Sequence, residues 1–286
     1  MLLLALAAGF HCHIATVNHG LRAEAADECR LVENLCGELD VPCTVIDIML
    51  AKGNVQQEAR RARYEALATW AMRERLETIL TAHHADDQAE TLLMRLNRGS
   101  GLAGLAGVRE RRMIEGTPIE VTRPLLGFRR SELQGVIDGA GVAVADDPSN
   151  RDRTYDRVRM RQKLERSDLI DVDGLARSAS LIDESWLMVK GLAGEDVTLH
   201  AKRLGEAFAY NPFAASGVAR VPIWIEVIRM IGGDLGVTLA RGDAAKIVAA
   251  LQDARKVNVG GLSAEIVEDQ GAKIWSFRRE PPRRIG

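Results

Sequence analysis

Two histidines and three carboxylates lie close together in the segment from Thr81 to Thr91, TAHHADDQAET. The aliphatic residues 77–81 predict a strand just before them, so they fall at a strand's carboxyl end, where open α/β sheets bind ligands. In the helix expected to follow, Asp87 and Glu90 are three residues apart and share a face. Such carboxylates could hold a magnesium ion or an ammonium group.

Two alternatives apply to this acidic segment. Asp residues in a first helical turn also interact favourably with the helix dipole, and they need no ligand to do so. A metal site built from His83, His84 and the carboxylates is a rival. A structural zinc site is disfavoured because further nitrogen or sulfur ligands are missing.

Two other segments could contact an anion. Asn18-His19-Gly20-Leu21-Arg22 follows another predicted strand and offers an imidazole at His19 and a guanidinium at Arg22. The glycines of Arg98-Gly99-Ser100-Gly101 would let backbone N–H groups, including that of Ser100, approach a phosphate closely. A glycine that ends a helix explains this second segment nearly as well.

Arginine and lysine are concentrated in the chain even though the formal net charge is only -2. Residues 151–166 contain seven of them against three acidic residues, and Arg157 and Arg161 are spaced to share a helix face. Arg60 and Arg63 could point at one phosphate, or they could pair with neighbouring glutamates on a solvated helix. Further arginines lie at positions 109, 111, 112, 123, 129 and 130. This clustering points to a polyanionic partner as strongly as it does to a merely solvated face.

The elements expected to position these residues define an α/β fold, a parallel sheet flanked by helices. Strands are predicted at 13–17, 43–48, 77–81 and 119–121, and helices at 24–39, 55–75, 86–97, 129–140 and through the basic stretch after residue 150. Composition changes near Arg166, which predicts a catalytic domain over 1–166 and a smaller domain over 167–286. The second domain is predicted to be helical at 174–208, 222–231 and 242–254 and to end in short strands.

Bulk composition sets broad limits. With 286 residues, 47% apolar and 27% charged, the chain is expected to be globular, neither disordered nor a membrane protein. The apolar residues 1–8 are too few to span a bilayer, and we expect them to form the buried face of a helix. The four cysteines show no metal-binding spacing, which predicts buried thiols and a reducing cytoplasm.

Five motifs in order resemble those of the tRNA(Ile)-lysidine synthetases across roughly residues 14 to 165. They are VNHGLR, ARRARY, ILTAHHADDQAETLLMRLNRGSGLAGLAG, RPLLGFRR and DDPSNRDRTYDRVRMR. The tail GGLSAEIVEDQGAKIWSFRRE is similar, more weakly, to the family's smaller domain, which is expected to support tRNA binding.

The resemblance implies an ATP-pyrophosphatase domain of the adenine nucleotide alpha-hydrolase type, which uses ATP and Mg²⁺. It implies that free lysine is joined to carbon 2 of the wobble cytidine in an isoleucine tRNA with a CAU anticodon, through an adenylated cytidine. No membrane partner is expected, and no oligomeric state is predicted.

The resemblance also implies roles for individual residues. Asp87 and Glu90 match positions that hold the lysine, and together with His83 and His84 they form the implied catalytic set. His19 and Arg22 match the family motif after the second strand and, with Gly99, Ser100 and Gly101 from the glycine segment above, are the expected ATP-binding residues. Arg63, Arg157 and Arg161 match basic positions associated with activity or tRNA contact and, with Arg60, are the expected tRNA-binding residues. The family usually has Asn after the position of Arg157, where this sequence has Val158.

One family motif is missing from the sequence. Members begin with a strand and an SGGxDS loop that holds the ATP phosphates, whereas this sequence starts at Met1-Leu2-Leu3-Leu4, in what we expect to be the following helix. A start codon placed too late is the favoured explanation, and a shortened, inactive relative is the other. Two alternative functions stay open: a tRNA thiolase of the same group, and a non-catalytic tRNA-binding protein.

Overall fold

The computed structural model describes residues 1–18, 24–48, 55–145, 152, 154, 156–214, 220–269 and 271–280. The chain forms two compact units, Met1–Asp183 and Glu184–Gly286. The division falls within helix α8 (Val172–His200), after the change in composition near Arg166. The role of the second part in tRNA binding stays a prediction.

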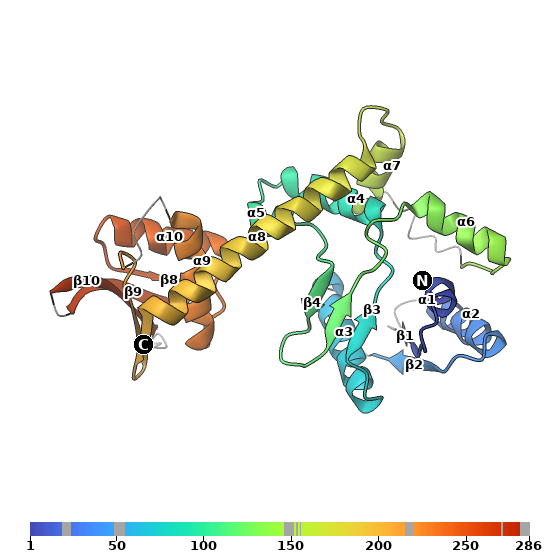
Figure 1. The fold of residues 1–286 in the computed structure, drawn as a ribbon, viewed down its shortest axis with the longest axis horizontal. Helices are drawn as coiled ribbons and strands as arrows, with labels where there is room; N and C mark the ends of the chain where they lie inside the picture. Colours follow the sequence, from blue (N-terminus) through green and yellow to red (C-terminus); the bar gives the residue numbers. More distant parts are fainter. Residues whose placement is uncertain are drawn as a thin grey trace. The chain divides into compact units, whose positions relative to one another are not determined.

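The first unit has the expected parallel strands (Figure 1). Strand β1 (Ile14–Asn18) pairs in parallel with β2 (Cys43–Asp47), and β3 (Thr78–Leu80) pairs in parallel with β5 (Glu120–Thr122). Strand β4 (Arg111–Met113) lies antiparallel to β5. The sequence did not predict β4, because all three of its residues are exposed and show no apolar alternation.

Helices alternate with these strands, as the sequence predicted. Their bounds are α1 (Leu2–Ala7), α2 (Glu24–Glu38), α3 (Val55–Arg73), α4 (Ala85–Leu96), α5 (Leu102–Leu105), α6 (Arg130–Ala140) and α7 (Asp156–Glu165). Gly141 ends α6 in a left-handed conformation with φ of 64°, which a residue without a Cβ adopts easily. The prediction for α1 was wrong in one respect: none of its residues is buried.

Two clusters of buried side chains hold the first unit together. Helix α3 packs Tyr64 and Trp70 against Ile79 of β3 and Val121 of β5. A smaller cluster joins Ala89 of α4, Leu164 of α7 and Val172 at the start of α8. This second cluster fixes the acidic helix α4 against the basic helix α7.

The second unit contains an antiparallel sheet in the order β6-β7-β10-β9-β8. Its elements are β6 (Ala201–Leu204), β7 (Ala207–Tyr210), α9 (Val221–Asp234), α10 (Arg241–Gln252), β8 (Val257–Val259), β9 (Leu262–Asp269) and β10 (Ala272–Arg279). The helix predicted to run to Phe208 ends at His200, so that prediction was wrong beyond this residue. The chain turns at Gly205, with φ of 62°, and Phe208 and Tyr210 are buried where β7 pairs with β10.

Within the described ranges, no helix is both long enough and apolar enough to cross a membrane.

Candidate active site

Helix α4 begins directly after the chain leaves β3, as the sequence predicted. The N–H of His84, the residue before the helix, donates to Asp87 Oδ2 at 3.0 Å and so closes the first turn. On the opposite face, Ala89 and Leu92 are buried. Helix α4 therefore has one face fixed in the core, and Asp87 and Glu90 both come from a helix held in place at a strand end.

Glu90 is the most buried carboxylate of this helix, with 1% of its surface exposed. Its two oxygens accept hydrogen bonds from α7: Oε2 from Arg157 Nε at 2.6 Å and Oε1 from Arg161 Nε at 2.7 Å. Arg157 also donates through Nη2 to Asp87 Oδ1 at 2.5 Å. A buried carboxylate is tolerated when it is paired and hydrogen-bonded, and these contacts meet that condition.

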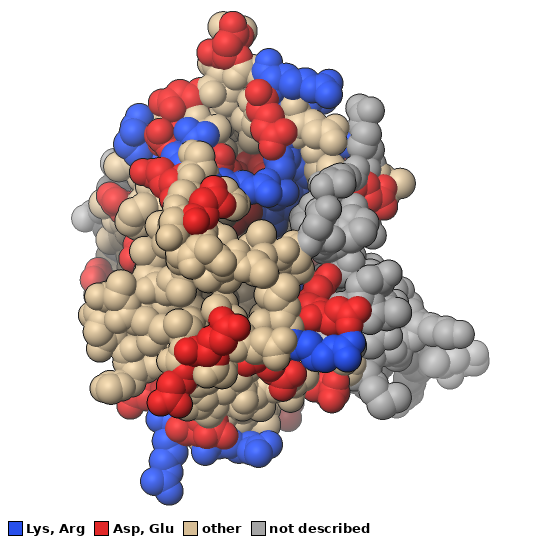
Figure 2. All heavy atoms as spheres, turned by 90° about the vertical axis from the view of Figure 1, so that its right-hand side faces the viewer, with Lys and Arg blue, Asp and Glu red and all other residues tan. Residues whose placement is uncertain are grey.

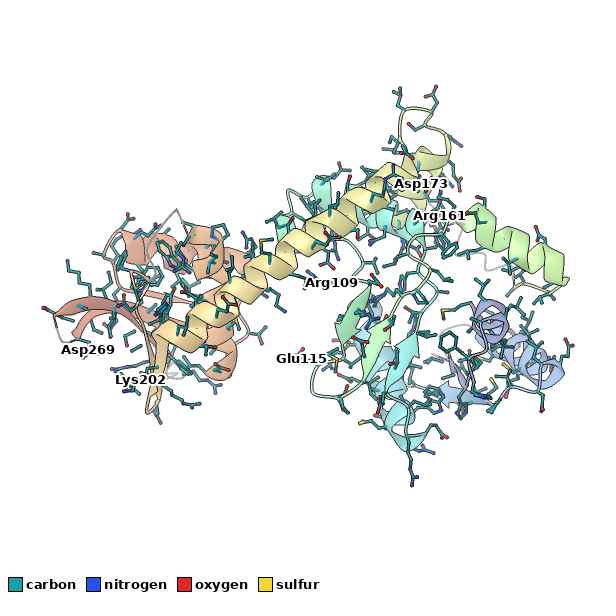
Figure 3. All side chains as sticks on the ribbon, in the orientation of Figure 1. Arg109, Glu115, Arg161, Asp173, Lys202 and Asp269 are labelled. Carbon is teal, nitrogen blue, oxygen red and sulfur yellow. The ribbon has the colours of Figure 1, made fainter. Side chains whose placement is uncertain are left out.

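The charges in this cluster act on one another. Burial alone lowers the pKa of Arg161, but the hydrogen bond and charge of Glu90, together with Asp87, outweigh it and leave the pKa raised. Figure 3 labels Arg161 on helix α7. The two guanidiniums and two carboxylates thus form one neutralised network.

Asp86 faces a different set of basic groups. Its Oδ2 accepts the N–H of Arg130 at 2.8 Å, and its Oδ1 lies 3.3 Å from Arg129 Nη2. Burial raises the pKa of Asp86, but these contacts outweigh burial and hold it below its usual value. Asp86 therefore anchors the start of α6, and it lines a small pocket together with Glu90 and Arg161.

The two histidines lie beside the acidic helix in different environments. Burial, followed by the charge of Arg123, lowers the pKa of His83 to about 4, so its imidazole is neutral at neutral pH. Its Nδ1 is 3.0 Å from the hydroxyl of Thr81. Nδ1 of His84 is buried, lies 3.5 Å from Asp86 Oδ2, and makes no hydrogen bond to the described residues.

The residues predicted to bind ATP receive no support from this geometry. His19 and Arg22 lie outside the described residues. Gly99 and Ser100 donate their N–H groups to Leu96 and Arg95 carbonyls, as the residues that end a helix do. Gly101 precedes the four-residue helix α5. The ATP-binding role of this segment stays a prediction.

The predicted tRNA-binding arginines are divided between two places. Arg157 and Arg161 do share a face, and both donate to Glu90 of α4, although the Arg157 side chain is 43% exposed. The Arg60 guanidinium carbon lies 5.2 Å from the ring centre of Tyr64, in cation–π geometry, and Arg63 is exposed. Val158, in place of the family's Asn, is buried beside the arginine pair.

Three residues important to this architecture were not singled out from sequence. Arg123, counted there among the basic residues, is 2% exposed and donates to the Arg109 carbonyl at 2.6 Å. Gln88 is buried and bridges the N–H and carbonyl of Val108 at 2.6 and 2.7 Å. Gly107 has φ of 66° and leaves room for Gln88. Of these three features, only the positive φ at residue 107 could have been predicted from the sequence, because the residue there is a glycine.

Acidic and basic side chains are interspersed on the face shown in Figure 2. In the part of the chain that the structure describes, no group of three or more His, Cys, Asp or Glu side chains could hold a metal ion. The carboxylates of α4 are already matched by arginines, so they do not fit a magnesium site in this arrangement.

The four cysteines are free thiols. Cys29 and Cys36 are buried on α2, as expected, whereas Cys12 and Cys43 are only half-buried. Burial, and then the neighbouring Cys36, raise the pKa of Cys43 to about 12. Such a thiol is a poor nucleophile and a poor ligand for a metal cluster at neutral pH.

The chain is similar in sequence to several known proteins. A PP-loop domain model matches residues 1–167. A tRNA(Ile)-lysidine synthase from Zymomonas mobilis is 36% identical over 292 residues, covering 99% of this chain and 85% of that protein. One from Novosphingobium aromaticivorans is 39% identical over 274 residues, covering 95% and 82%. A solved U34-tRNA thiolase from Methanococcus maripaludis is 14% identical, with a TM-score of 0.49, over 61% of this chain and 62% of that one.

Proposed function

The chain belongs to the tRNA(Ile)-lysidine synthase family, and we propose that it joins free lysine to carbon 2 of the wobble cytidine of an isoleucine tRNA with a CAU anticodon. In this reaction the cytosine oxygen attacks the α-phosphate of ATP and pyrophosphate leaves. The lysine side-chain amine, as the free base, then attacks carbon 2 and gives up a proton. AMP departs with the oxygen.

The observation that carries this proposal is the pair of carboxylates Asp87 and Glu90 on one face of α4, at the end of a strand. Both accept hydrogen bonds from a cationic side chain of the protein itself, Arg157. The pair therefore offers negatively charged oxygens that accept hydrogen bonds from a cation, as a lysine ammonium requires. Asp87, with 13% of its side chain exposed, is the more accessible member.

Binding of lysine at Asp87 would require a change at Arg157. The Arg157 side chain is 43% exposed, so its guanidinium can turn towards solvent and does not become a buried charge without a partner. Glu90 would keep its hydrogen bond from Arg161 at 2.7 Å. On this scheme Asp87 contacts the lysine directly, and Glu90, held in place by Arg161, is the second carboxylate of the lysine site.

The imidazole of His83 adds a neutral polar group near these charges. Because its pKa is about 4, the imidazole carries no charge at neutral pH. It therefore neither repels the lysine ammonium nor forms an ion pair with it. It can accept or donate one hydrogen bond to a substrate. We propose this role for His83, and a hydrogen bond to substrate from the buried Nδ1 of His84.

ATP is the proposed co-substrate and Mg²⁺ the proposed metal. The described carboxylates offer no magnesium site, so no step is assigned to the metal here. We also propose a cytoplasmic location, supported by four cysteines that are all free.

A thiolase is the alternative from the same group, and the cysteines argue against it. A reaction that transfers sulfur uses reactive thiolates or a cluster held by them. Here two thiols are buried, and the raised pKa of Cys43 keeps its thiol protonated.

The test is a nucleoside analysis after reaction. The chain, and a form extended by any in-frame upstream codons, are incubated with ATP, lysine and the isoleucine tRNA, and digested nucleosides are weighed by mass spectrometry. Lysidine that appears only when lysine is present supports the proposal. Cytidine that stays unchanged in both forms, or gains sulfur, refutes it.

A substitution then tests the lysine contact itself. Asp87→Asn keeps the acceptor oxygen for the His84 N–H but removes the charge, so the KM for lysine should rise about tenfold or more. Glu58→Gln, at an exposed position of α3, is the matched control. An equal effect of Asp87→Asn on ATP and lysine would contradict the assignment.

A further inference from the structure

Helix α7 presents two different basic faces. Arg157 and Arg161 point at the carboxylates of α4. Arg159 and Lys163 are also four residues apart, but they are offset from the first pair by two residues, about 200° around the helix. The basic stretch therefore has an inner face used within the protein and an outer face available to a partner.

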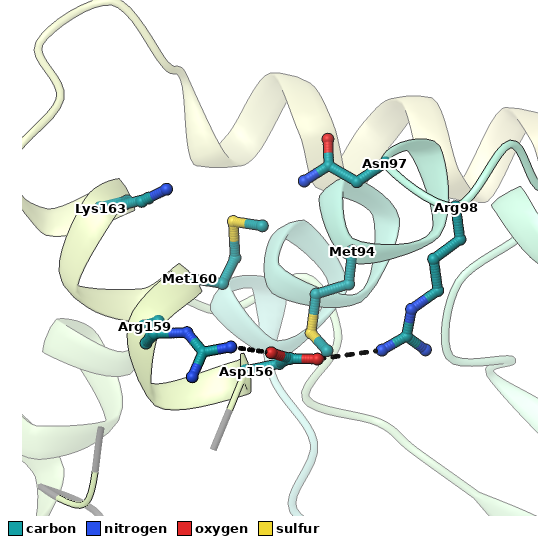
Figure 4. A pocket seen from close by; sticks show the side chains of 7 residues that line it. All are labelled: Met94, Asn97, Arg98, Asp156, Arg159, Met160 and Lys163. Carbon is teal, nitrogen blue, oxygen red and sulfur yellow. Dashed lines mark hydrogen bonds and ion pairs between the residues drawn. The ribbon is translucent and has the colours of Figure 1, made fainter. Parts of the chain in front are cut away.

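The outer face lines a cavity between α7 and the end of α4 (Figure 4). The cavity has a volume of about 220 Å³. Its lining side chains are Met94, Asn97, Arg98, Asp156, Arg159, Met160 and Lys163. All of them belong to α4, α7 or the residues just after α4, so the cavity lies within the first unit.

Cations dominate the rim of this cavity. Arg98 Nη2 lies 3.3 Å from Asp156 Oδ2, and Arg159 also pairs with Asp156. Figure 4 shows the two guanidiniums reaching the same carboxylate from opposite sides. Lys163 forms no ion pair with the residues that the structure describes. Three cations thus line a cavity with one carboxylate, and two of them, Arg98 and Arg159, are already arranged around that anionic group.

The walls of the cavity are suited to a flat apolar group. Met94 and Met160 contribute thioether side chains, which are polarizable and pack favourably against aromatic rings. Asn97 adds an amide that can both donate and accept hydrogen bonds. Phosphate-binding cations next to surfaces on which a base can pack are the combination that single-stranded nucleic acid needs.

We propose that this cavity binds one nucleotide of the tRNA, with its phosphate at Arg98, Arg159 and Lys163 and its base against the two methionines. The inference rests on the proposed function in taking tRNA as the RNA. The volume favours part of a long ligand, because complete small-molecule sites measure roughly 300–1,000 Å³.

Asp156 has a specific role in this proposal. Its carboxylate holds the two arginines in place when no RNA is bound, and it repels the incoming phosphate. Removing its charge should consequently strengthen binding, whereas removing a cation should weaken it. Opposite signs from neighbouring residues are not expected from a general loss of structure.

The experiment measures the affinity of the purified chain for unmodified isoleucine tRNA by filter binding at several salt concentrations between about 50 and 200 mM. Arg159→Ala and Lys163→Ala should each weaken binding about threefold or more and reduce the magnitude of the salt slope by about 0.7. Asp156→Asn should strengthen binding at the lowest salt. Met160→Ala should weaken binding while leaving the salt slope unchanged.

Arg30→Ala is the matched control, because Arg30 is an exposed arginine of α2 that also pairs with an aspartate, Asp27. It should leave affinity and slope unchanged. The proposal is overturned if Arg159→Ala and Lys163→Ala behave like this control, or if they raise the KM for ATP without changing tRNA affinity. Weaker binding by Asp156→Asn would also overturn it.

These outcomes are separable from those of the proposed function. Binding does not require catalysis, so a chain that makes no lysidine but loses tRNA affinity with Arg159→Ala refutes the reaction and retains the cavity. If the chain makes lysidine and its variants without these cations bind tRNA equally well, the proposed reaction is retained and the nucleotide-binding role of the cavity is refuted.

Discussion

Replacing Glu90 by glutamine should destabilise the first unit even though the shape of the side chain is kept. Glu90 is 1% exposed and accepts Arg157 Nε and Arg161 Nε at 2.6 and 2.7 Å. A glutamine offers one acceptor and turns its NH₂ towards the other donor. Two buried hydrogen bonds between opposite charges are thereby reduced to one bond from a cationic donor to a neutral acceptor.

The size of the effect follows from how well the arginines can reach water. Breaking a buried ion pair costs about 3–5 kcal/mol when the remaining charge is stranded. Here the Arg157 side chain is 43% exposed and that of Arg161 22%, so the lower end applies. We expect a loss of about 3 kcal/mol in the free energy of unfolding. For a unit of this size, Met1–Asp183, that lowers its Tm by about 6–12 °C.

Scanning calorimetry measures this change as a shift of the unfolding transition to which the first unit contributes. Glu58→Gln, exposed on α3, should shift the unfolding free energy by no more than about 0.5 kcal/mol. The double variant Glu90→Gln/Arg161→Gln should lose about 1 kcal/mol or more less unfolding free energy than the two single variants lose together. The reason is that the second substitution removes the charge that the first one leaves unpaired. A loss below about 1 kcal/mol from Glu90→Gln, with strict additivity, would refute the reasoning.

Two further predictions concern single residues of the same unit. Burial and then Arg123 lower the pKa of His83 to about 4, below the value of about 6.5 of an unfolded histidine, so this group's stabilising effect is complete above pH 6.5 and is lost as the pH falls towards 4. Allowing for partial exposure, His83→Gln should remove about 1–2 kcal/mol of the pH dependence in urea unfolding, and an unchanged pH profile would count against it. Gly107→Ala should cost about 2 kcal/mol or more in the same assay, because its Cβ would lie 2.3 Å from Gln88 Oε1. Gly99→Ala, with a similar φ of 65° and open space, should cost about 1 kcal/mol, and equal losses for the two would disprove the steric argument.

Local sequence patterns were enough to predict most of the fold. The helix from 86 to 97 and the strand from 77 to 81 were predicted because their apolar periodicity and end signals lie within a few residues of each other. Residues 201–208 were misassigned as helix, because the pairing of β7 with β10 joins segments far apart in sequence. Tertiary pairing overrode local preference there.

The residues of the candidate site could be predicted from the sequence, but the contacts between them could not. The strand-end position of Asp87 and Glu90 followed from spacing, and so did the shared face of Arg157 and Arg161. That these two sets bind each other was not predicted, since spacing gives the direction of a face but not the element it meets. Arg123 likewise looked like a surface cation, and only the packing around it shows that it is buried.

The separation in sequence between Glu90 and its two partners, 67 and 71 residues, also bears on synthesis of the protein. On the ribosome, α4 emerges well before α7, and a carboxylate cannot settle into the interior until its counter-charges arrive. We expect the nascent first unit to keep α4 open to proteases until residue 161 has emerged. Released fragments ending at residues 145 and 183 would show this as faster and slower cleavage within residues 85–96, and equal rates would speak against it.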